Sequence, residues 1–276
     1  MIELLFEFCH LNLLMVNPFI FILGTAVGSF LNVLIDRLPN EKKITGRSKC
    51  DHCRHKLAWY DLVPVLSFFL LEGKCRYCGK KLSLQYPLVE VLTGLMFVII
   101  LNFNPPTGGQ ISNYFLPVAY FGIISSLIVI FFADLKYQII PDSMQMVFFV
   151  FSFFFHLISN FNPPTGGQIS NFLISGLVVM LPILLLWLVT RGRGMGFGDV
   201  KLAFTIGFLL GIKAGFLALY FGFIIGAIAS LFLIILKKKQ LKSKIAFGPF
   251  LVLGILIMIF FQKQVFEIIK KIYGLS

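Results

Sequence analysis

Two aspartates in this chain could form an acid–base pair. Asp199 lies in the run Gly194-Met195-Gly196-Phe197-Gly198-Asp199-Val200-Lys201, between two long apolar segments, and Asp134 ends another apolar segment. A carboxylate at the end of a membrane-spanning segment is costly unless it has a partner or a task. Two carboxylates at one site can share a proton, so that one is a neutral acid while the other is ionised and activates water. Such a pair could hydrolyse a peptide without a metal or a covalent intermediate.

The glycine run alone has two interpretations. Alternating glycines let the backbone adopt conformations that are closed to other residues, and they let another chain approach closely. The run is therefore either a flexible loop with a solvated aspartate or a pliable loop that carries a catalytic carboxylate. The second aspartate favours the catalytic interpretation, with Gly196, Gly198 and Lys201 in supporting roles. Lys201 would be an anchor at the membrane surface, or a charge partner that biases which aspartate stays ionised.

Four cysteines form a second candidate site. Cys50 and Cys53 make one Cys-x-x-Cys pair, and Cys75 and Cys78 make another after 21 intervening residues. Two such pairs at this spacing predict a tetrahedral zinc site with four thiolate ligands. Two disulfides are the alternative. A reducing compartment such as the cytoplasm would argue against them. One of the two nearby histidines could replace a cysteine as ligand, although four thiolates already close the site.

The elements that must position these residues are membrane helices. The chain is 58% hydrophobic and only 13% charged, which is the composition of an integral membrane protein. A helix needs about 17–25 apolar residues to span the bilayer core. We therefore predict an all-α polytopic membrane protein with about eight transmembrane helices. Gly211, Lys213 and Gly215 predict a tight turn between the sixth and seventh of these helices. The candidate spans are residues 17–35, 86–102, 115–133, 143–159, 171–190, 200–213, 215–236 and 248–265.

The distribution of charge predicts the orientation of these spans. The net charge is +12, and 20 of the 24 Lys and Arg fall on one side if residues 36–85 face the cytoplasm. Because basic residues favour the cytoplasmic side, we expect a multi-pass protein of the cell membrane with both termini outside. Asp134 and Asp199 then lie at the same cytoplasmic face. The expected partner of the positive charge is the lipid bilayer, with residues 237–239 as an anchor for anionic lipid, and not a nucleic acid.

We expect three regions along the chain. Residues 1–35 form a lead-in and the first transmembrane helix, in which Gly24 and Gly28 favour close helix packing. Residues 36–85 form a small cytoplasmic domain around the cysteine pairs, with so little core of its own that a metal would stabilise it. Residues 86–276 form the multi-pass membrane domain that carries both aspartates.

Two further features are ambiguous in the sequence. Glu90, one turn inside the second span, either reaches the membrane interface or makes a polar contact with the soluble segment. Residues 103–113 recur unchanged as residues 161–171. Nothing else at that offset repeats, so we predict two uncharged connectors on the outer side and not an architectural repeat.

The chain resembles the bacterial type IV prepilin peptidases over nearly its whole length. These are bifunctional leader peptidases and N-methyltransferases of the Gly-x-Gly-Asp class of membrane aspartyl proteases. That motif alone is not specific, whereas the combination of motifs is. The matching motifs are Gly28-Ser29-Phe30-Leu31-Asn32-Val33, Arg37-Leu38-Pro39, the two cysteine pairs, Tyr86-Pro87-Leu88-Val89-Glu90, Asp134 with Ile140-Pro141-Asp142, residues 194–201 and Phe247-Gly248-Pro249-Phe250.

The resemblance implies a role for each site. It implies that the two aspartates are catalytic and that the four cysteines bind structural zinc. It implies removal of the short basic leader of prepilins or pseudopilins after a glycine, at the cytoplasmic face, in type IV pilus or type II secretion systems. It also implies methylation of the new N-terminal residue with S-adenosylmethionine, and it associates the methyltransferase with the cytoplasmic residues 36–85. The sequence has no Rossmann-type glycine fingerprint for that cofactor, so methyl transfer rests on the resemblance alone and its residues are unknown.

Two other functions would also fit these residues. A membrane methyltransferase could keep the acids as structural groups, and a non-enzymatic transporter could use them to relay protons. Both aspartates are expected at one membrane face and not along a path across it, which argues against the transporter.

Overall fold

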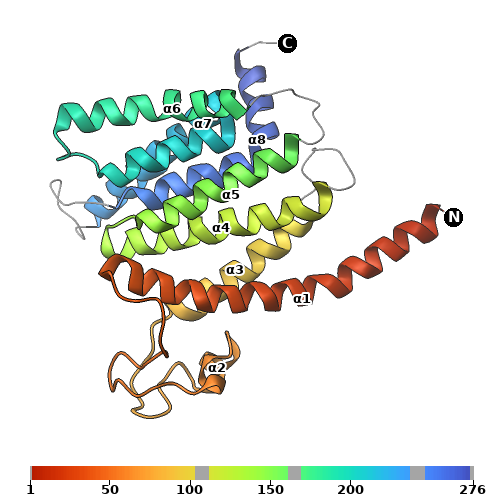
Figure 1. Ribbon diagram of the computed structural model, residues 1–276, viewed down its shortest axis with the longest axis vertical. Coiled ribbons are helices and arrows are strands. Elements are labelled where there is room, and N and C mark those ends of the chain that lie inside the picture. The colour runs from red at the N-terminus through yellow and green to blue at the C-terminus, as the bar shows by residue number, and fades with distance from the viewer. Residues whose placement is uncertain (1, 103–111, 161–168, 237–245, 274–276) are drawn as a thin grey trace. The chain divides into compact units, whose positions relative to one another are not determined.

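The computed structural model of the protein describes residues 2–102, 112–160, 169–236 and 246–273. Within these ranges the chain forms helices, turns and two isolated β-bridges, which confirms the predicted all-α class (Figure 1). Most of both repeat copies and the lysine run at 237–239 lie outside the described residues. The helices are α1 (Ile2–Arg37), η1 (Leu38–Asn40), η2 (Trp59–Leu62), α2 (Leu66–Leu70), α3 (Gln85–Asn102), α4 (Ser112–Tyr137), α5 (Asp142–Asn160), α6 (Ile169–Thr190), α7 (Phe197–Ile235) and α8 (Gly248–Tyr273).

Seven of these helices are long and apolar enough to cross a membrane. They coincide with the predicted spans, except that the sixth and seventh spans together form α7. This helix has 39 residues, about 58 Å at 1.5 Å per residue, against a bilayer core of about 30 Å. Its backbone departs from helical geometry at Gly211 (φ 79°, ψ 177°), and a Cβ on Gly215 would lie only 3.2 Å from the Cα of Gly207. The two halves of α7 therefore turn back on each other at the predicted turn.

The chain divides into two compact units. The first comprises Met1–Pro106 and Tyr120–Val129, and so contains α1, α3, the segment between them and part of α4. The second comprises Thr107–Ala119 and Ile130–Ser276, and so contains the C-terminal end of α4 and helices α5 to α8. The four cysteines belong to the first unit and both aspartates to the second, so each candidate site lies within a single unit.

In the first unit, α1 and α3 pack through glycines. A Cβ on Gly24 would lie 2.7 Å from the Cα of Gly94, and a Cβ on Gly28 would lie 2.7 Å from the Cα of Glu90. These distances leave no room for a side chain on either residue of α1. The predicted close packing at Gly24 and Gly28 is therefore confirmed.

The second unit also packs through small residues and buried polar contacts. A Cβ on Gly207 of α7 would lie 2.6 Å from the carbonyl oxygen of Ser175 on α6. His156 of α5 is buried and its Nε2 lies 2.8 Å from the carbonyl oxygen of Phe208 on α7. Such contacts give apolar helices a specific arrangement where lipid supplies no hydrophobic drive between them.

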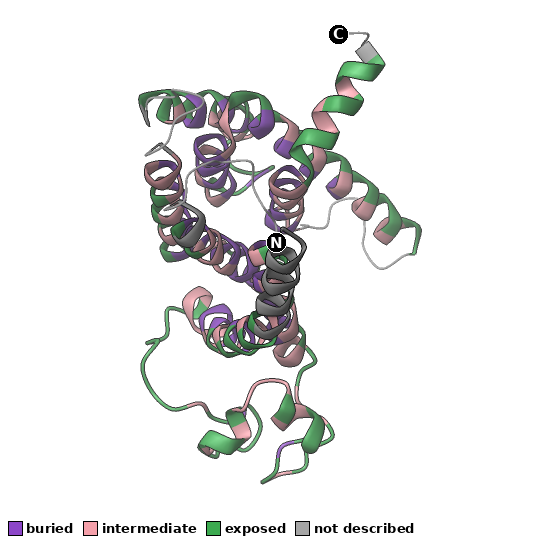
Figure 2. Cartoon of the chain, turned by 90° about the vertical axis from the view of Figure 1, so that its right-hand side faces the viewer, coloured by how far each residue is buried: buried purple, intermediate pink, exposed green. Residues whose placement is uncertain are grey.

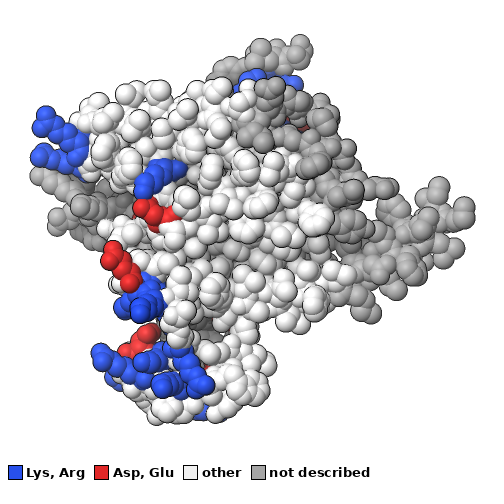
Figure 3. All heavy atoms as spheres, viewed as in Figure 1, with Lys and Arg blue, Asp and Glu red and all other residues white. Residues whose placement is uncertain are grey.

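The outward faces of the helices are apolar. Figure 2 shows exposed residues along many helix faces, and they include large side chains such as Phe19 and Val189, which is 84% exposed. In the view of Figure 3, charged side chains are sparse over the helices, and those of the first unit gather over the segment that contains α2. Contiguous apolar surface of this extent is expected where lipid covers it, which fits a multi-pass membrane protein.

Candidate active site and metal centre

Asp134 lies in the last turn of α4 and is 5% exposed. Its Oδ2 accepts a hydrogen bond of 2.8 Å from the backbone N–H of Gly248, the first residue of α8. The C-terminus of a helix disfavours negative charge, whereas the N-terminus of a helix favours it. The start of α8 therefore provides the stabilisation that α4 cannot give to this carboxylate.

Asp199 lies in the first turn of α7 and is 7% exposed. Its Oδ2 accepts a hydrogen bond of 3.1 Å from the backbone N–H of Gly196, three residues earlier. This is the contact that an acid makes in the first turn when it caps its own helix. The glycine run thus ends in a carboxylate that is turned back towards the start of α7.

The fold brings the two predicted acids together. Their carboxylates are near enough to interact electrostatically, and both are buried in the second unit. Two negative charges in a medium of low dielectric repel each other strongly. A single proton shared between them relieves this repulsion, and leaves one acid and one base at the same site.

Two residues of the α4–α5 region complete the surroundings of the pair. The side chain of Ile140 lies close to both Gly198 and Gly248. A Cβ added to either glycine would lie 3.2 Å from an Ile140 side-chain carbon. Gln145 of α5 donates through Nε2 to the carbonyl oxygen of Gly198 at 3.2 Å. The Gln145 Oε1 is buried and has no hydrogen-bond partner among the described residues. A buried acceptor without a partner is uncommon in proteins, which marks Gln145 as a candidate site residue.

Neither residue was identified as a site residue from the sequence. A signal for Gln145 was present, because it is a polar residue one turn inside a predominantly apolar span. Ile140 gave no such signal, since an apolar residue between two spans is unremarkable. For Gly248 the motif Phe247-Gly248-Pro249-Phe250 marked the position but not its contact.

The glycine run differs in one respect from expectation. Its glycines do not adopt left-handed conformations, and Gly196 has a φ of −74°. The positive φ angles of this region belong instead to Arg191 (50°) and Gly192 (72°). The expected close approach of another segment is present at Gly198, where a Cβ would crowd Ile140.

Lys201 forms an ion pair next to the aspartates. Its Nζ lies 2.8 Å from Oδ1 of Asp142 and 5.4 Å from the ring centre of Phe197. Asp142 is the first residue of α5, a position at which the helix dipole favours an acid. The pair links α7 to α5 and is exposed, so it contributes at most about 1 kcal/mol to stability.

The four cysteines of the first unit are positioned to bind a metal ion. Their sulfur atoms all lie within 4.8 Å of one another, and those of Cys50 and Cys78 are 3.9 Å apart. A tetrahedral ion with metal–sulfur bonds of about 2.3 Å separates its sulfurs by about 3.8 Å. All four cysteines are free thiols, so the alternative of two disulfides is wrong.

The two cysteine pairs repeat one backbone conformation. The N–H of Arg54 donates to the carbonyl oxygen of Cys50 at 2.9 Å, and the N–H of Gly79 donates to that of Cys75 at 2.8 Å. Arg54 and Gly79 follow the second cysteine of their pairs and both have positive φ, 57° and 67°. Each pair is therefore a knuckle that turns its two sulfurs to the same side.

The surroundings of Cys50 favour its ligand form. Burial opposes the thiolate, but hydrogen bonds from the backbone of Cys53 and His52 outweigh it and lower the pKa of Cys50 to about 7. The thiolate is the form of cysteine that binds metals.

Asp61 ties the second knuckle to the rest of the soluble segment. Its carboxylate accepts hydrogen bonds from Arg76 Nε at 2.8 Å, the Tyr77 hydroxyl at 3.2 Å and the Ala58 N–H at 3.2 Å. Burial opposes the charge of Asp61, but these donors, Arg76 foremost, hold its pKa below the usual range. A segment with so small a core thus has a polar network in addition to its cluster of four cysteines.

Glu90 of α3 contacts the soluble segment, which is the second of its two expected roles. Its Oε2 accepts a 2.7 Å hydrogen bond from the N–H of Val65. Val65 has φ 63° and ψ −53°, a conformation that is costly for a β-branched residue. The hydrogen bond to Glu90 compensates for part of that cost and fixes the segment to the start of α3.

A multi-pass helical protein with two buried, interacting carboxylates has the elements of a membrane peptidase. Residues 22–103 match the bacterial peptidase A24 N-terminal domain, and residues 121–231 match the type IV leader peptidase family. The chain belongs to the type IV leader peptidase family.

Several curated relatives are similar over most of the chain, and each is called a prepilin leader peptidase/N-methyltransferase. The protein of Bacillus subtilis (strain 168) is 31% identical, over 85% of this chain and 90% of its own length. That of Burkholderia pseudomallei (strain 1026b) is 30% identical, over 88% and 84%. That of Aeromonas salmonicida (strain A449) is 28% identical, over 91% and 92%. No solved structure matches the chain.

Proposed function

We propose that this protein is a prepilin leader peptidase and N-methyltransferase that uses Asp134 and Asp199 to cleave its substrate. Membership of the family and the names of the relatives support prepilin processing and N-methylation. The observation that carries the catalytic assignment is the pair of buried carboxylates, of which one accepts from the N–H of the N-cap residue of α7 and the other from the N–H of the first residue of α8. One carboxylate, ionised, takes a proton from the attacking water, and the other, protonated, donates to the departing amine.

The proposed substrate is a prepilin or pseudopilin with a short basic leader, cut after a glycine. The reaction takes place at the cytoplasmic face of the cell membrane, with both termini of the enzyme outside. The positive charge of residues 36–85 supports this orientation. We retain three regions, residues 1–35, 36–85 and 86–276, as the lead-in with its first helix, the metal-binding domain and the peptidase domain.

Incubation of the purified protein with a prepilin and S-adenosylmethionine tests the function. Mass spectrometry is expected to show loss of the leader and addition of one methyl group to the new N-terminus. An intact prepilin after prolonged incubation would contradict the peptidase. Methylation of a pre-cleaved pilin without any cleavage would favour the alternative of a methyltransferase with structural acids.

We propose that the four-cysteine centre holds a structural zinc ion. The sulfur separations and the proposed cytoplasmic location fit Zn²⁺, which prefers four thiolates in structural sites. Bound zinc would fix the two knuckles and thereby the loop between them.

Replacement of one ligand should release this metal. In Cys50→Ser we expect zinc to fall from about one ion per chain to less than about a tenth, because a serine hydroxyl is a poor zinc ligand. Elemental analysis of the purified proteins measures this, and Cys9→Ser, which changes the cysteine outside the knuckles, is the control. Zinc that stays stoichiometric in Cys50→Ser would argue against a four-thiolate site.

Replacement of Gln145 should impair cleavage without removing either acid. Gln145→Leu loses the hydrogen bond to the Gly198 carbonyl and the unpartnered Oε1, so kcat/KM for a prepilin is expected to fall about 10-fold, equivalent to about 1.4 kcal/mol. Gln262→Leu makes the same change at an exposed position of α8 and should cleave normally. Equal activity of the two variants would exclude a role for Gln145.

A further inference from the structure

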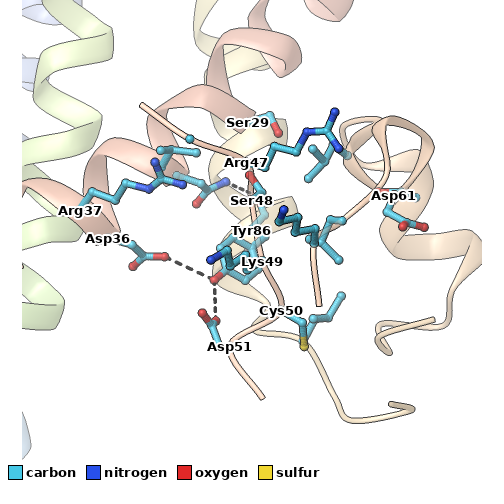
Figure 4. A pocket seen from close by; sticks show the side chains of 18 of the residues that line it. Ser29, Asp36, Arg37, Arg47, Ser48, Lys49, Cys50, Asp51, Asp61 and Tyr86 are labelled. Atoms are coloured by element: carbon cyan, nitrogen blue, oxygen red, sulfur yellow. Dashed lines mark hydrogen bonds between the residues drawn. The ribbon is translucent and has the colours of Figure 1, made fainter. Parts of the chain in front are cut away.

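The first unit contains a cavity of about 740 Å³ whose lining includes neither Asp134 nor Asp199. It lies where the end of α1 and the start of α3 meet the soluble segment, and its lining extends from Ser29 to Glu90 (Figure 4). Sites for small molecules typically have about 300–1,000 Å³ and combine apolar walls with a few polar groups. The cavity is therefore large enough for a cofactor.

A buried polar atom in its wall lacks a partner. Asn32 lines the cavity and is 4% exposed. Its Nδ2 donates to the carbonyl oxygen of Tyr86 at 3.0 Å, but its Oδ1 is buried without a hydrogen-bond partner in the described ranges. Buried polar atoms are nearly always paired, so an unpartnered acceptor on a residue that lines a cavity points to a donor supplied from outside the protein.

The acidic groups of the cavity suit a ligand with positive charge and hydroxyl donors. Figure 4 shows the Tyr86 hydroxyl between the carboxylates of Asp36 and Asp51, at 3.3 and 3.1 Å. Glu90, buried at the start of α3, adds a further carboxylate to the lining.

Other parts of the lining suit an anionic end and an aromatic ring. Arg37 donates to three consecutive backbone carbonyls, residues 43–45, which fixes this stretch at the cavity. Arg47 and Lys49 add positive charge that can bind a carboxylate. Phe68 and Leu71 supply an apolar wall on which a planar base can lie.

We propose that this cavity binds S-adenosylmethionine. The sulfonium, ammonium and ribose hydroxyls of that molecule match the acids and Asn32, its carboxylate matches the basic residues, and its adenine matches the apolar wall. The proposal rests on the methyltransferase part of the proposed function. It gives that activity the residues which the sequence could not provide.

Direct binding to the full-length protein in detergent tests the assignment. Calorimetry with S-adenosylmethionine is expected to show at least about 10-fold weaker binding for Asn32→Leu and for Glu90→Gln, while prepilin cleavage persists. Asn102→Leu is the matched control, because Asn102 lies at the other end of α3 and outside the cavity. Wild-type affinity in both Asn32→Leu and Glu90→Gln would overturn the proposal.

Ultraviolet crosslinking of radiolabelled S-adenosylmethionine to the wild-type protein gives an answer that does not depend on the folding of any variant. Label in peptides of residues 29–90 supports the cavity. Label confined to other peptides overturns the cavity but not methyl transfer. Failure of the wild type to bind S-adenosylmethionine, with cleavage intact, overturns both the cavity and the methyltransferase part of the proposed function.

Discussion

Asp134→Asn and Asp199→Asn are each expected to lower the rate of prepilin cleavage by about 10²–10⁴-fold. An amide has nearly the shape of a carboxylic acid, and its oxygen can still accept the hydrogen bond from Gly248 or from Gly196. It cannot share a proton with the opposite carboxylate, so no acid–base pair remains. The loss should therefore appear in kcat and not in the amount of protein inserted in the membrane.

Single-turnover cleavage of a labelled prepilin measures this loss. Asp142→Asn is the matched control, because Asp142 is also an acid at a helix end but its side chain is 71% exposed. Among the described ion pairs, Asp142 pairs only with Lys201. We expect it to retain at least about half of wild-type activity, since exposed pairs contribute little. Methylation of a pre-cleaved pilin should persist in all three variants. Substantial cleavage by either Asp134→Asn or Asp199→Asn would refute the two-aspartate mechanism.

Gly248→Ala is expected to reduce cleavage by about 10²-fold although it removes no functional group. The added Cβ would lie 2.8 Å from Oδ2 of Asp134 and 3.2 Å from Cδ1 of Ile140. The backbone N–H that holds Asp134 is retained, so the carboxylate must move aside while keeping its charge. A displacement of about 1 Å in a catalytic group can cost this much in rate.

Gly226→Ala is the control for loss of a helical glycine. Its Cβ would meet the side chain of Phe250 at 3.1 Å and neither aspartate, so we expect activity close to that of the wild type. Comparison of kcat for the two variants, with zinc content as a check on folding, isolates the steric effect on Asp134. Normal turnover by Gly248→Ala would mean that the contact between α8 and Asp134 is dispensable.

The membrane helices and the cysteine knuckles were predictable because their signals are local. Long apolar runs specify spanning helices wherever they occur, since the bilayer has no other partner for backbone polar groups. The turn at Gly211 followed from closely spaced glycines, and the spacing of Cys50 to Cys78 predicted a cluster that the fold assembles. The sequence predicted about eight transmembrane helices, whereas the structure has seven helices long and apolar enough to span a membrane among the described residues. The difference arises because α7 contains two of the predicted spans and reverses at Gly211 without a loop.

What the sequence by itself determined is the class of protein, its apolar spans, the metal-binding cysteines and the identity of two unusual acids. Only the tertiary structure decided how Asp134 is stabilised, because its hydrogen-bond donor is Gly248, 114 residues along the chain. The same holds for the contact of Gln145 with the glycine run and for the cavity around Asn32. Periodicity and motif spacing report on neighbours along the chain. Contacts between helices depend on which helix faces meet. Small residues, charges and helix caps determine this, but they act only when the helices pack together.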